Sequence, residues 1–193
     1  MATTVRAFGL DVGSATTKLV GVDEDGRLVY HLLEETDPRV EAQTERLIET
    51  ARGELAGEAD GAPLVATGYG RKLVAGASRS ITEITCHARG VHRATGRGGT
   101  LVDIGGQDSK VVVIGSEGAV TDFAMNDKCA AGTGRFLENT ATRLKVPIER
   151  MGEMALSAEG EVPISSTCTV FAESEIVSMI ARGAEVDRIV RGL

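Results

Sequence analysis

The sequence lacks the features that would place the protein in a membrane or on nucleic acid. Its apolar runs are short, such as Val111 to Ile114, whereas a membrane-spanning helix needs about 20 apolar residues in a row. The chain does not begin with a charged leader followed by an apolar stretch, and it has no block of Lys and Arg. A net charge of −7 also disfavours binding to polyanions. We therefore expect a cytoplasmic protein with no nucleic-acid or membrane partner.

Cysteine is also scarce. The 193 residues include three cysteines, Cys86, Cys129 and Cys168, which are far apart and odd in number. That pattern does not indicate a disulfide framework, and in a reducing compartment such residues are thiols, metal ligands or catalysts. The chain has neither a Walker P-loop nor a dinucleotide-binding fingerprint. Any nucleotide site must therefore be built in another way.

The chain contains one pattern of elements twice, in which three strands joined by turns precede a helix. Alternation of apolar residues and glycine-containing turns predict the strands, and apolar residues at helical spacing predict the helices. The expected strands are 5–11, 18–23, a third from residue 28, a buried strand at 64–67, and then 100–104, 109–114 and 119–125. The expected helices cover 40–55, 81–91, 136–144 and 170–182, and another begins near residue 185. A glycine-rich hinge at 96–99 divides the chain into domains 1–97 and 98–193.

The first turn of each half has the same chemistry. The segments "GLDVGSATTK" (9–18) and "LVDIGGQDSK" (101–110) both run from Asp-x-Gly through small residues to a Lys. Glycine allows close backbone approach, and consecutive amides, hydroxyls and a Lys can bind phosphate, while an Asp at a strand end can hold Mg²⁺ through water. One such turn is more simply an ordinary hairpin with a glycine corner. Two matching turns at the starts of two matching halves favour a phosphate site.

The two turns and three further motifs resemble known proteins. The paired turns resemble the actin, Hsp70 and sugar kinase ATPase fold, which is ribonuclease H-like. The segments "ATGYGR" (66–71), "VDIGGQDSK" (102–110), "NDKCAAGTGRF" (126–136) and "SSTCTVFAESE" (165–175) together resemble the BadF/BadG/BcrA/BcrD group. That group includes activators of 2-hydroxyacyl-CoA dehydratases and the ATPase subunits of benzoyl-CoA reductases. The resemblance implies an α/β fold of two similar halves, the second of them truncated.

The resemblance also implies the activity. It suggests an ATP-dependent one-electron donor that is a homodimer bridged by one [4Fe-4S] cluster, takes electrons from a ferredoxin or flavodoxin, and reduces an iron-sulfur acyl-CoA dehydratase or reductase. The helices behind the two cysteine motifs would change their mutual angle with the nucleotide state.

Each candidate residue has an expected role in that activity. The residues expected to be catalytic, by organising Mg²⁺ or orienting the attacking water, are Asp11, Asp103, Gln107 and Asp108. Those expected to bind the nucleotide are Gly13, Ser14, Ala15, Thr16, Thr17, Lys18, Gly105, Gly106 and Lys110. The expected cluster ligands are Cys129 and Cys168.

The residues alone support the cysteine assignment less sharply. Cys129 and Cys168 each precede a predicted helix, whose free amides and positive dipole end favour a thiolate and an anionic cluster. An all-cysteine cubane needs four thiolates, so a two-fold axis would have to supply a second pair. Without the resemblance, ligand, catalyst and buried hydrophobe are equally open for both residues. Cys86 fits a structural role, because its surroundings indicate a helix.

Two alternatives share part of this evidence. A small-molecule kinase of the same fold would need a substrate pocket with a catalytic Asp, and a non-enzymatic metal-binding module would not need duplicated phosphate turns. The chain also stops before the later glycine-rich segment that holds adenine and ribose in the actin-like fold. We therefore expect an N-terminal part of a protein of roughly 250 residues by comparison with the family, with weakened ATP affinity in the 193-residue chain.

Overall fold

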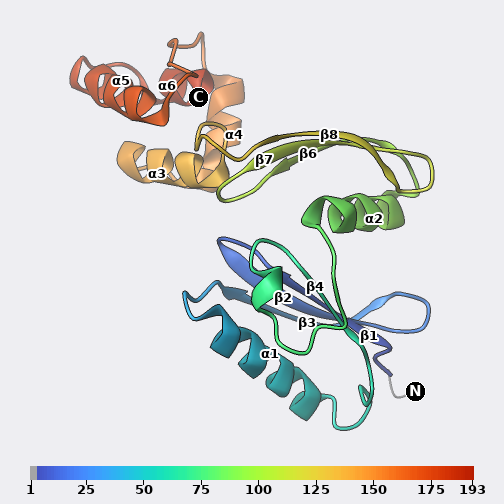
Figure 1. Ribbon diagram of the computed structural model, residues 1–193. Coiled ribbons are helices and arrows are strands. Elements are labelled where there is room, and N and C mark those ends of the chain that lie inside the picture. Colours follow the sequence, from blue (N-terminus) through green and yellow to red (C-terminus); the bar gives the residue numbers. More distant parts are fainter. Residues whose placement is uncertain (1–3) are drawn as a thin grey trace. The chain divides into compact units, whose positions relative to one another are not determined.

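The computed structural model describes residues 4–193, which form two compact units (Figure 1). One unit contains the chain up to Gly99 together with Val113–Thr121, and the other contains Thr100–Val112 and Asp122–Leu193. Each unit draws on two stretches of chain, so the simple division at residue 97 stays a prediction. Within the described residues, no helix is both long enough and apolar enough to cross a membrane.

A five-stranded sheet in the order β3-β2-β1-β4-β5 forms the centre of the first unit. Its strands are β1 (Ala7–Val12), β2 (Thr16–Val22), β3 (Leu28–Glu35), β4 (Leu64–Thr67) and β5 (Arg79–Ser80). Strands β1, β2 and β3 pair antiparallel, and β4 joins β1 in parallel. Alternate residues of β1 and β2 are fully buried, as the period of two along a strand requires. The expected strands of this unit are therefore present. Strand β5 was not anticipated, because it consists of two residues that are both exposed.

Helices complete the first unit. Helix α1 (Val40–Glu54) contributes Leu47 and Ala51 to the core that contains Leu10 and Leu19 of the sheet. Burial of each such leucine contributes about 1.5–3 kcal/mol. A short helical turn, η1 (Arg71–Leu73), follows β4, and helix α2 (Glu83–Thr95) begins after Thr82, whose hydroxyl accepts a hydrogen bond from the Thr85 amide. Capping of this kind stabilises a helix start by about 1 kcal/mol.

The second sheet has the order β6-β7-β8 and leads into four helices. The strands are β6 (Gly99–Ile104), β7 (Ser109–Ile114) and β8 (Val120–Asn126), and the helices are α3 (Gly134–Leu144), α4 (Ile148–Ser157), α5 (Thr169–Ala181) and α6 (Val186–Gly192). Phe136, Met151, Ile176 and Ile189, one from each helix, share a buried core. The pattern of three strands followed by a helix is thus confirmed in both halves. Helix α4 was not among the expected helices.

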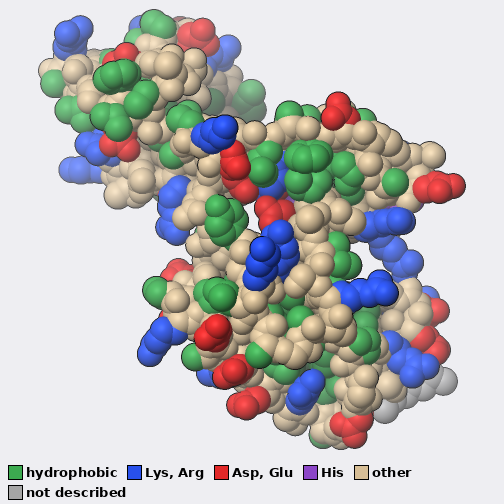
Figure 2. Space-filling model, in the orientation of Figure 1, with side chains coloured by type: hydrophobic (Ala, Val, Ile, Leu, Met, Phe, Trp, Pro, Cys, Tyr) green, Lys and Arg blue, Asp and Glu red, His purple; other side chains and the backbone are tan. Residues whose placement is uncertain are grey.

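One face of the second sheet is apolar and exposed. Hydrophobic side chains gather at the surface over β6, β7 and β8, and others over α5 (Figure 2). Five large hydrophobic side chains of the sheet within the second unit are between 41% and 63% exposed: Val102, Ile104, Val111, Phe123 and Met125. Their alternation along the strands places them on one side of the sheet. Contiguous exposed apolar surface of this kind is typical of interaction surfaces.

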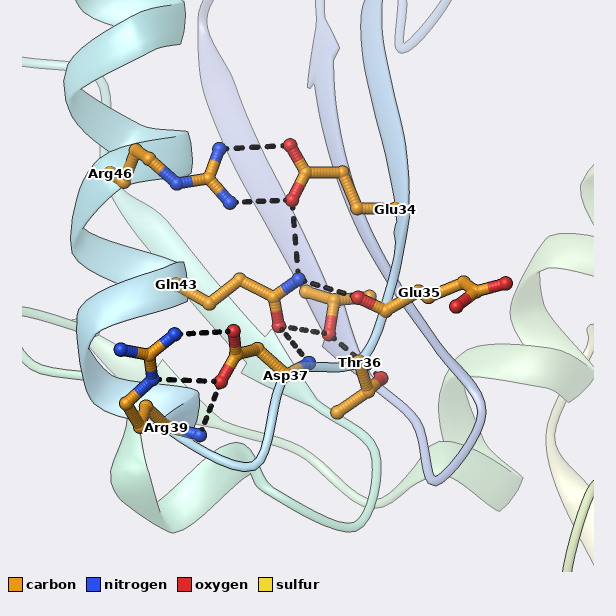
Figure 3. Close-up of polar contacts among 8 residues, drawn as sticks. Glu34, Glu35, Thr36, Asp37, Arg39, Gln43 and Arg46 are labelled. Atoms are coloured by element: carbon orange, nitrogen blue, oxygen red, sulfur yellow. Dashed lines mark hydrogen bonds and ion pairs between the residues drawn. The ribbon is translucent and has the colours of Figure 1, made fainter.

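An ion pair joins strand β3 to helix α1. The Arg46 guanidinium donates two parallel hydrogen bonds to the Glu34 carboxylate, with Nη1 2.9 Å from Oε1 and Nη2 2.6 Å from Oε2 (Figure 3). The hydrogen bonds from Arg46, and a further one from Gln43, lower the pKa of Glu34 to about 2. The charged form of Glu34 is therefore favoured in the folded protein.

This pair predicts a specific pH dependence of stability. A carboxyl whose pKa is lowered on folding contributes above its ordinary pKa of 4.5, and the contribution is lost as the pH falls towards 2. We expect Glu34→Gln to lower the free energy of unfolding at pH 7 by up to about 1 kcal/mol, because the pair is partly exposed. Urea unfolding between pH 7 and pH 3 should show the difference from the wild type shrinking with acid. Glu45→Gln, in helix α1 next to Arg46, is the control. A difference from the wild type that stayed constant with pH, or that Glu45→Gln reproduced, would contradict this expectation.

Candidate functional site

The first glycine turn is closed by its own backbone. It connects β1 to β2, and the Gly13 amide donates to the Thr16 carbonyl at 3.0 Å. A Cβ at Gly13 would lie 2.8 Å from that carbonyl oxygen, so a side chain does not fit there. Asp11 and Lys18 are paired in the strand register, and Lys18 Nζ lies 3.0 Å from Asp11 Oδ2. The Asp and the Lys that stand seven residues apart in the sequence therefore form an ion pair across the two strands, beside the turn.

The segment that follows β3 is hydrogen-bonded to the first turn. The Thr36 hydroxyl donates to the Gly13 carbonyl at 2.8 Å, and the Thr36 amide donates to the Ala15 carbonyl at 2.9 Å. Thr17 is fully buried, and its hydroxyl lies 3.0 Å from that of Thr36. Thr17 thus supports the turn from inside, and its expected contact with phosphate stays a prediction. Sequence reasoning missed Thr36, which carries no motif.

The "ATGYGR" segment lies against Asp11. Gly68, with φ of 84°, would place a Cβ 2.4 Å from Asp11 Oδ1, and the Gly70 amide donates to the Val12 carbonyl at 2.9 Å. Thr67 pairs with Asp11 in the strand register, and its Oγ1 is buried without a hydrogen-bond partner among the described residues. A carboxylate beside a buried hydroxyl of this kind fits a hydrated Mg²⁺ ion. In the sequence, the two glycines of the motif, Gly68 and Gly70, were the feature that could have predicted this close approach to β1.

The second glycine turn, between β6 and β7, repeats the closure of the first. The Gly105 amide donates to the Asp108 carbonyl at 2.9 Å, and a Cβ at Gly105 would lie 2.6 Å from Asp108 Oδ1. The Lys110 side chain is only 4% exposed, and its Nζ lies 2.7 Å from Asp108 and 3.6 Å from Asp103. Gln107 is exposed at the tip. The two turns are therefore alike in backbone geometry as well as in sequence.

The second turn is bonded to the start of helix α3. The amides of Gly134 and Arg135 donate to the carbonyls of Gly105 and Gly106 at 2.8 and 3.2 Å, and the Ser109 hydroxyl donates to the Gly132 carbonyl. These helix amides were expected to be free to face Cys129, and that expectation was wrong. The reason is that Cys129 lies four residues before Thr133, the residue that caps the helix. The α3 amides hold the glycine turn instead.

Asn126 shapes the loop that carries Cys129. Its side-chain amide donates to the carbonyls of Cys129 and Ala131 at 2.9 and 3.1 Å, and its Oδ1 accepts from the Cys129 amide at 3.2 Å. The Ala131 amide points at Cys129 Sγ from 3.5 Å. The loop therefore presents a partly exposed sulfur in a surrounding that suits a metal ligand.

Cys168 occupies the capping position of α5. It is also partly exposed, and the next turn carries Val170 and Phe171, which are 65% and 62% exposed. Cys86 lies within α2. Among residues 4–193, no group of three or more His, Cys, Asp and Glu side chains is placed to hold a metal ion. Cys129 and Cys168 are two of the four thiolates that an all-cysteine cluster needs, and their role as ligands stays a prediction.

The comparisons with known proteins assign the family. Residues 8–193 match the model of the BadF/BadG/BcrA/BcrD ATPase family. The chain belongs to this family. It is 42% identical over 190 residues to the 2-hydroxyisocaproyl-CoA dehydratase activator of Clostridioides difficile, a match that covers 96% of this chain and 70% of the relative. It is 41% identical over 188 residues to the activator of lactoyl-CoA dehydratase of Anaerotignum propionicum, covering 96% of this chain and 72% of that activator. The family relation extends to the benzoyl-CoA reductase of Thauera aromatica, one component of which is 28% identical over 190 residues, covering 96% of this chain and 67% of that component.

A solved relative confirms the fold. The activator of the 2-hydroxyisocaproyl-CoA dehydratase from Clostridium difficile, solved with bound ADPNP, superposes with a TM-score of 0.82 at 38% identity. The match covers 96% of this family member and 69% of that structure. The expected α/β actin-like ATPase fold is thus confirmed. The roles of the individual site residues stay predictions.

The closed geometry of the first turn makes a testable prediction. Gly13→Ala should destabilise the protein by about 1–3 kcal/mol, because the added methyl would overlap the Thr16 carbonyl oxygen. The matched control is Gly53→Ala in α1, where an added Cβ meets nothing within 4 Å. That change should be neutral or stabilise by up to about 1 kcal/mol, since alanine favours a helix. Urea unfolding of both variants is the measurement, and equal effects would contradict the close approach at Gly13.

Proposed function

We propose that the protein is an ATP-hydrolysing one-electron donor for an iron-sulfur acyl-CoA dehydratase or reductase. The observation that carries the proposal is the direct bonding between the second glycine turn and the start of α3, whose capping residue lies four residues after Cys129. A change at the phosphates can therefore be transmitted to a cysteine through a few hydrogen bonds. The relative solved with ADPNP supports the nucleotide site in this proposal, and the relatives named as dehydratase activators support the dehydratase partner.

The two turns would act on the phosphates. The backbone amides around Gly13 and Gly105, the hydroxyls of Ser14 and Thr16, and Lys18 are donors suited to phosphate oxygens. Asp11 and Asp103 would hold Mg²⁺ through water, and the ion would neutralise charge that develops on the transferred phosphoryl group.

Residues of the second turn would complete the nucleotide chemistry. Lys110 is engaged with Asp103 and Asp108, so it would set the position of both carboxylates as well as add positive charge near the phosphates. Gln107, exposed at the tip, or Asp108 would orient the attacking water.

Cys129 and Cys168 would hold one [4Fe-4S] cluster together with the same residues of a second chain. When bound, the cluster would supply a one-electron carrier between a ferredoxin or flavodoxin and the partner enzyme. The exposed Val170 and Phe171 beside Cys168 support a homodimer, because two copies would cover apolar surface next to the shared site. The backbone donor at Cys129 Sγ and the N-terminal end of α5 at Cys168 would both suit sulfur atoms bound to an anionic cluster.

The turns predict a loss of ATP hydrolysis in two variants. Asp11→Asn and Asp103→Asn should each lower the rate of Mg²⁺-dependent hydrolysis by about 100-fold or more, because each removes a charge that holds the metal. Asp25→Asn, on the exposed hairpin between β2 and β3, is the matched control and should retain the rate. Phosphate release under steady-state conditions is the measurement. Wild-type rates in both turn variants would show that the turns are ordinary hairpins.

The cysteines predict iron binding that depends on two of the three thiols. Anaerobic reconstitution should give about four irons per dimer, and Cys129→Ala or Cys168→Ala should abolish this. Cys86→Ala is the control and should bind iron as the wild type does. Iron analysis with sedimentation measures both the stoichiometry and the dimer. If either of the first two variants kept its iron, the cluster assignment would be wrong.

A further inference from the structure

The geometry points to Thr36 and Gln43 as positioning residues that hold the first glycine turn in its phosphate-binding shape. Neither residue belongs to one of the sequence motifs described above. We call the hydrogen-bonded set Thr17, Thr36, Asp37 and Gln43, with Glu34 behind it, the Thr36–Gln43 network (Figure 3). Its functional consequence rests on the proposed function, whereas its effect on the turn does not.

Thr36 is the point at which the network meets the turn. Its hydroxyl contacts the Gly13 carbonyl at 2.8 Å and the Thr17 hydroxyl at 3.0 Å, and Thr17 also contacts Gln43 Oε1 at 3.3 Å. Two hydroxyls have two protons for these three contacts. Because a carbonyl oxygen can only accept, Thr36 donates its proton to Gly13, and the single Thr17 proton is left to the Thr36 hydroxyl or to Gln43 Oε1. The carbonyl orientation of Gly13, and with it the direction of the next amides, is thereby fixed.

Gln43 fixes the position of Thr36 and of the segment around it. The side chain is buried, and its Oε1 and both N–H groups of Nε2 have hydrogen-bond partners. Its Oε1 accepts from the Asp37 amide at 3.0 Å and lies 3.3 Å from the Thr17 hydroxyl, and its Nε2 donates to the Glu35 carbonyl at 2.7 Å and to Glu34 Oε2 at 3.2 Å. A buried amide with every donor and acceptor engaged tolerates little displacement. The connection between β3 and α1 is therefore rigid where it touches the turn.

The network ends in charged groups on both sides of Gln43. Arg46, one helical turn further along α1, binds the same Glu34 carboxylate through two hydrogen bonds. Asp37 accepts from the Arg39 amide at 2.7 Å and pairs with its guanidinium at 3.2 Å. Helix α1, whose Leu47 and Ala51 are buried in the core, is thus connected rigidly to the glycine turn.

The second turn shows why the side chain at position 36 matters. There the equivalent glycine carbonyl, that of Gly105, is held by a backbone amide of α3 at 2.8 Å. In the first turn a side-chain hydroxyl does the same, so this hydrogen bond can be removed by substitution without altering the backbone. If loss of the bond left the turn in its binding shape only a tenth of the time, the apparent dissociation constant would rise about tenfold, while the rate at saturation would not change.

Thr36→Val tests the inference, because valine keeps the shape and removes the hydroxyl. We expect hydrogen exchange at the Gly13 amide to become roughly tenfold faster without nucleotide, and the dissociation constant for Mg²⁺-ADPNP to rise by roughly tenfold. Thr36→Ser restores the hydroxyl and should return both values to near those of the wild type. The hydrolysis rate at saturating ATP should stay within about twofold of the wild type. Thr121→Val, which removes a hydroxyl that donates to a strand carbonyl at 3.1 Å, is the matched control and should change neither value.

The outcomes separate the inference from the function on which it rests. Unchanged exchange at Gly13 in a folded Thr36→Val protein would overturn the positioning role, whatever the nucleotide does. Faster exchange with an unchanged dissociation constant would overturn its consequence for binding. A wild-type chain that bound no ADPNP, with faster exchange still present in Thr36→Val, would overturn the proposed function and the binding consequence but would leave the structural role standing.

Discussion

Each half of the protein depends on one backbone constraint, the closure of a glycine turn two residues after an aspartate. Gly13 and Gly105 donate to carbonyls three residues later, at 3.0 and 2.9 Å, and in both cases a Cβ would overlap the residue that closes the turn. A tight turn of this kind directs successive amides outwards and leaves the aspartate at the end of the preceding strand. The Asp–Lys pairs lie beside the closed turns, and the proposed phosphate contacts and metal binding would depend on that closure.

The two turns are hydrogen-bonded to different parts of the chain, and this difference would give them separate roles in the proposed function. The first is held by the Thr36–Gln43 network, which connects it to α1 and makes it a rigid binding element. The second is held by the first amides of α3, which follows the Cys129 loop shaped by Asn126. A conformational change at the phosphates would therefore be resisted at the first turn and transmitted at the second. In the proposed function, this asymmetry would connect ATP hydrolysis to the cysteines without a change of fold.

Much of this architecture could be predicted from the sequence. The repeated strands, the Asp-x-Gly turns and the helices behind the cysteines have strong local signals, because period, glycine and spacing encode them directly. The bonding of Gly134 to Gly105 was not predictable in this way, since it joins segments 29 residues apart through backbone amides that any sequence has. Thr36 and Gln43 were missed for a similar reason. Their importance comes from what they contact after folding, and neither residue type in isolation indicates a phosphate site.

The central claim is that the nucleotide state at the second turn reaches Cys129. The most direct measurement uses the iron-free Cys86→Ala/Cys168→Ala protein, in which Cys129 is the remaining thiol, and follows its anaerobic alkylation with Mg²⁺-ADP, with Mg²⁺-ADPNP and without nucleotide. The account predicts rates that differ by at least about threefold between the two nucleotides, because the turn and the cysteine loop move together. Identical rates at saturating concentrations of both nucleotides would contradict it.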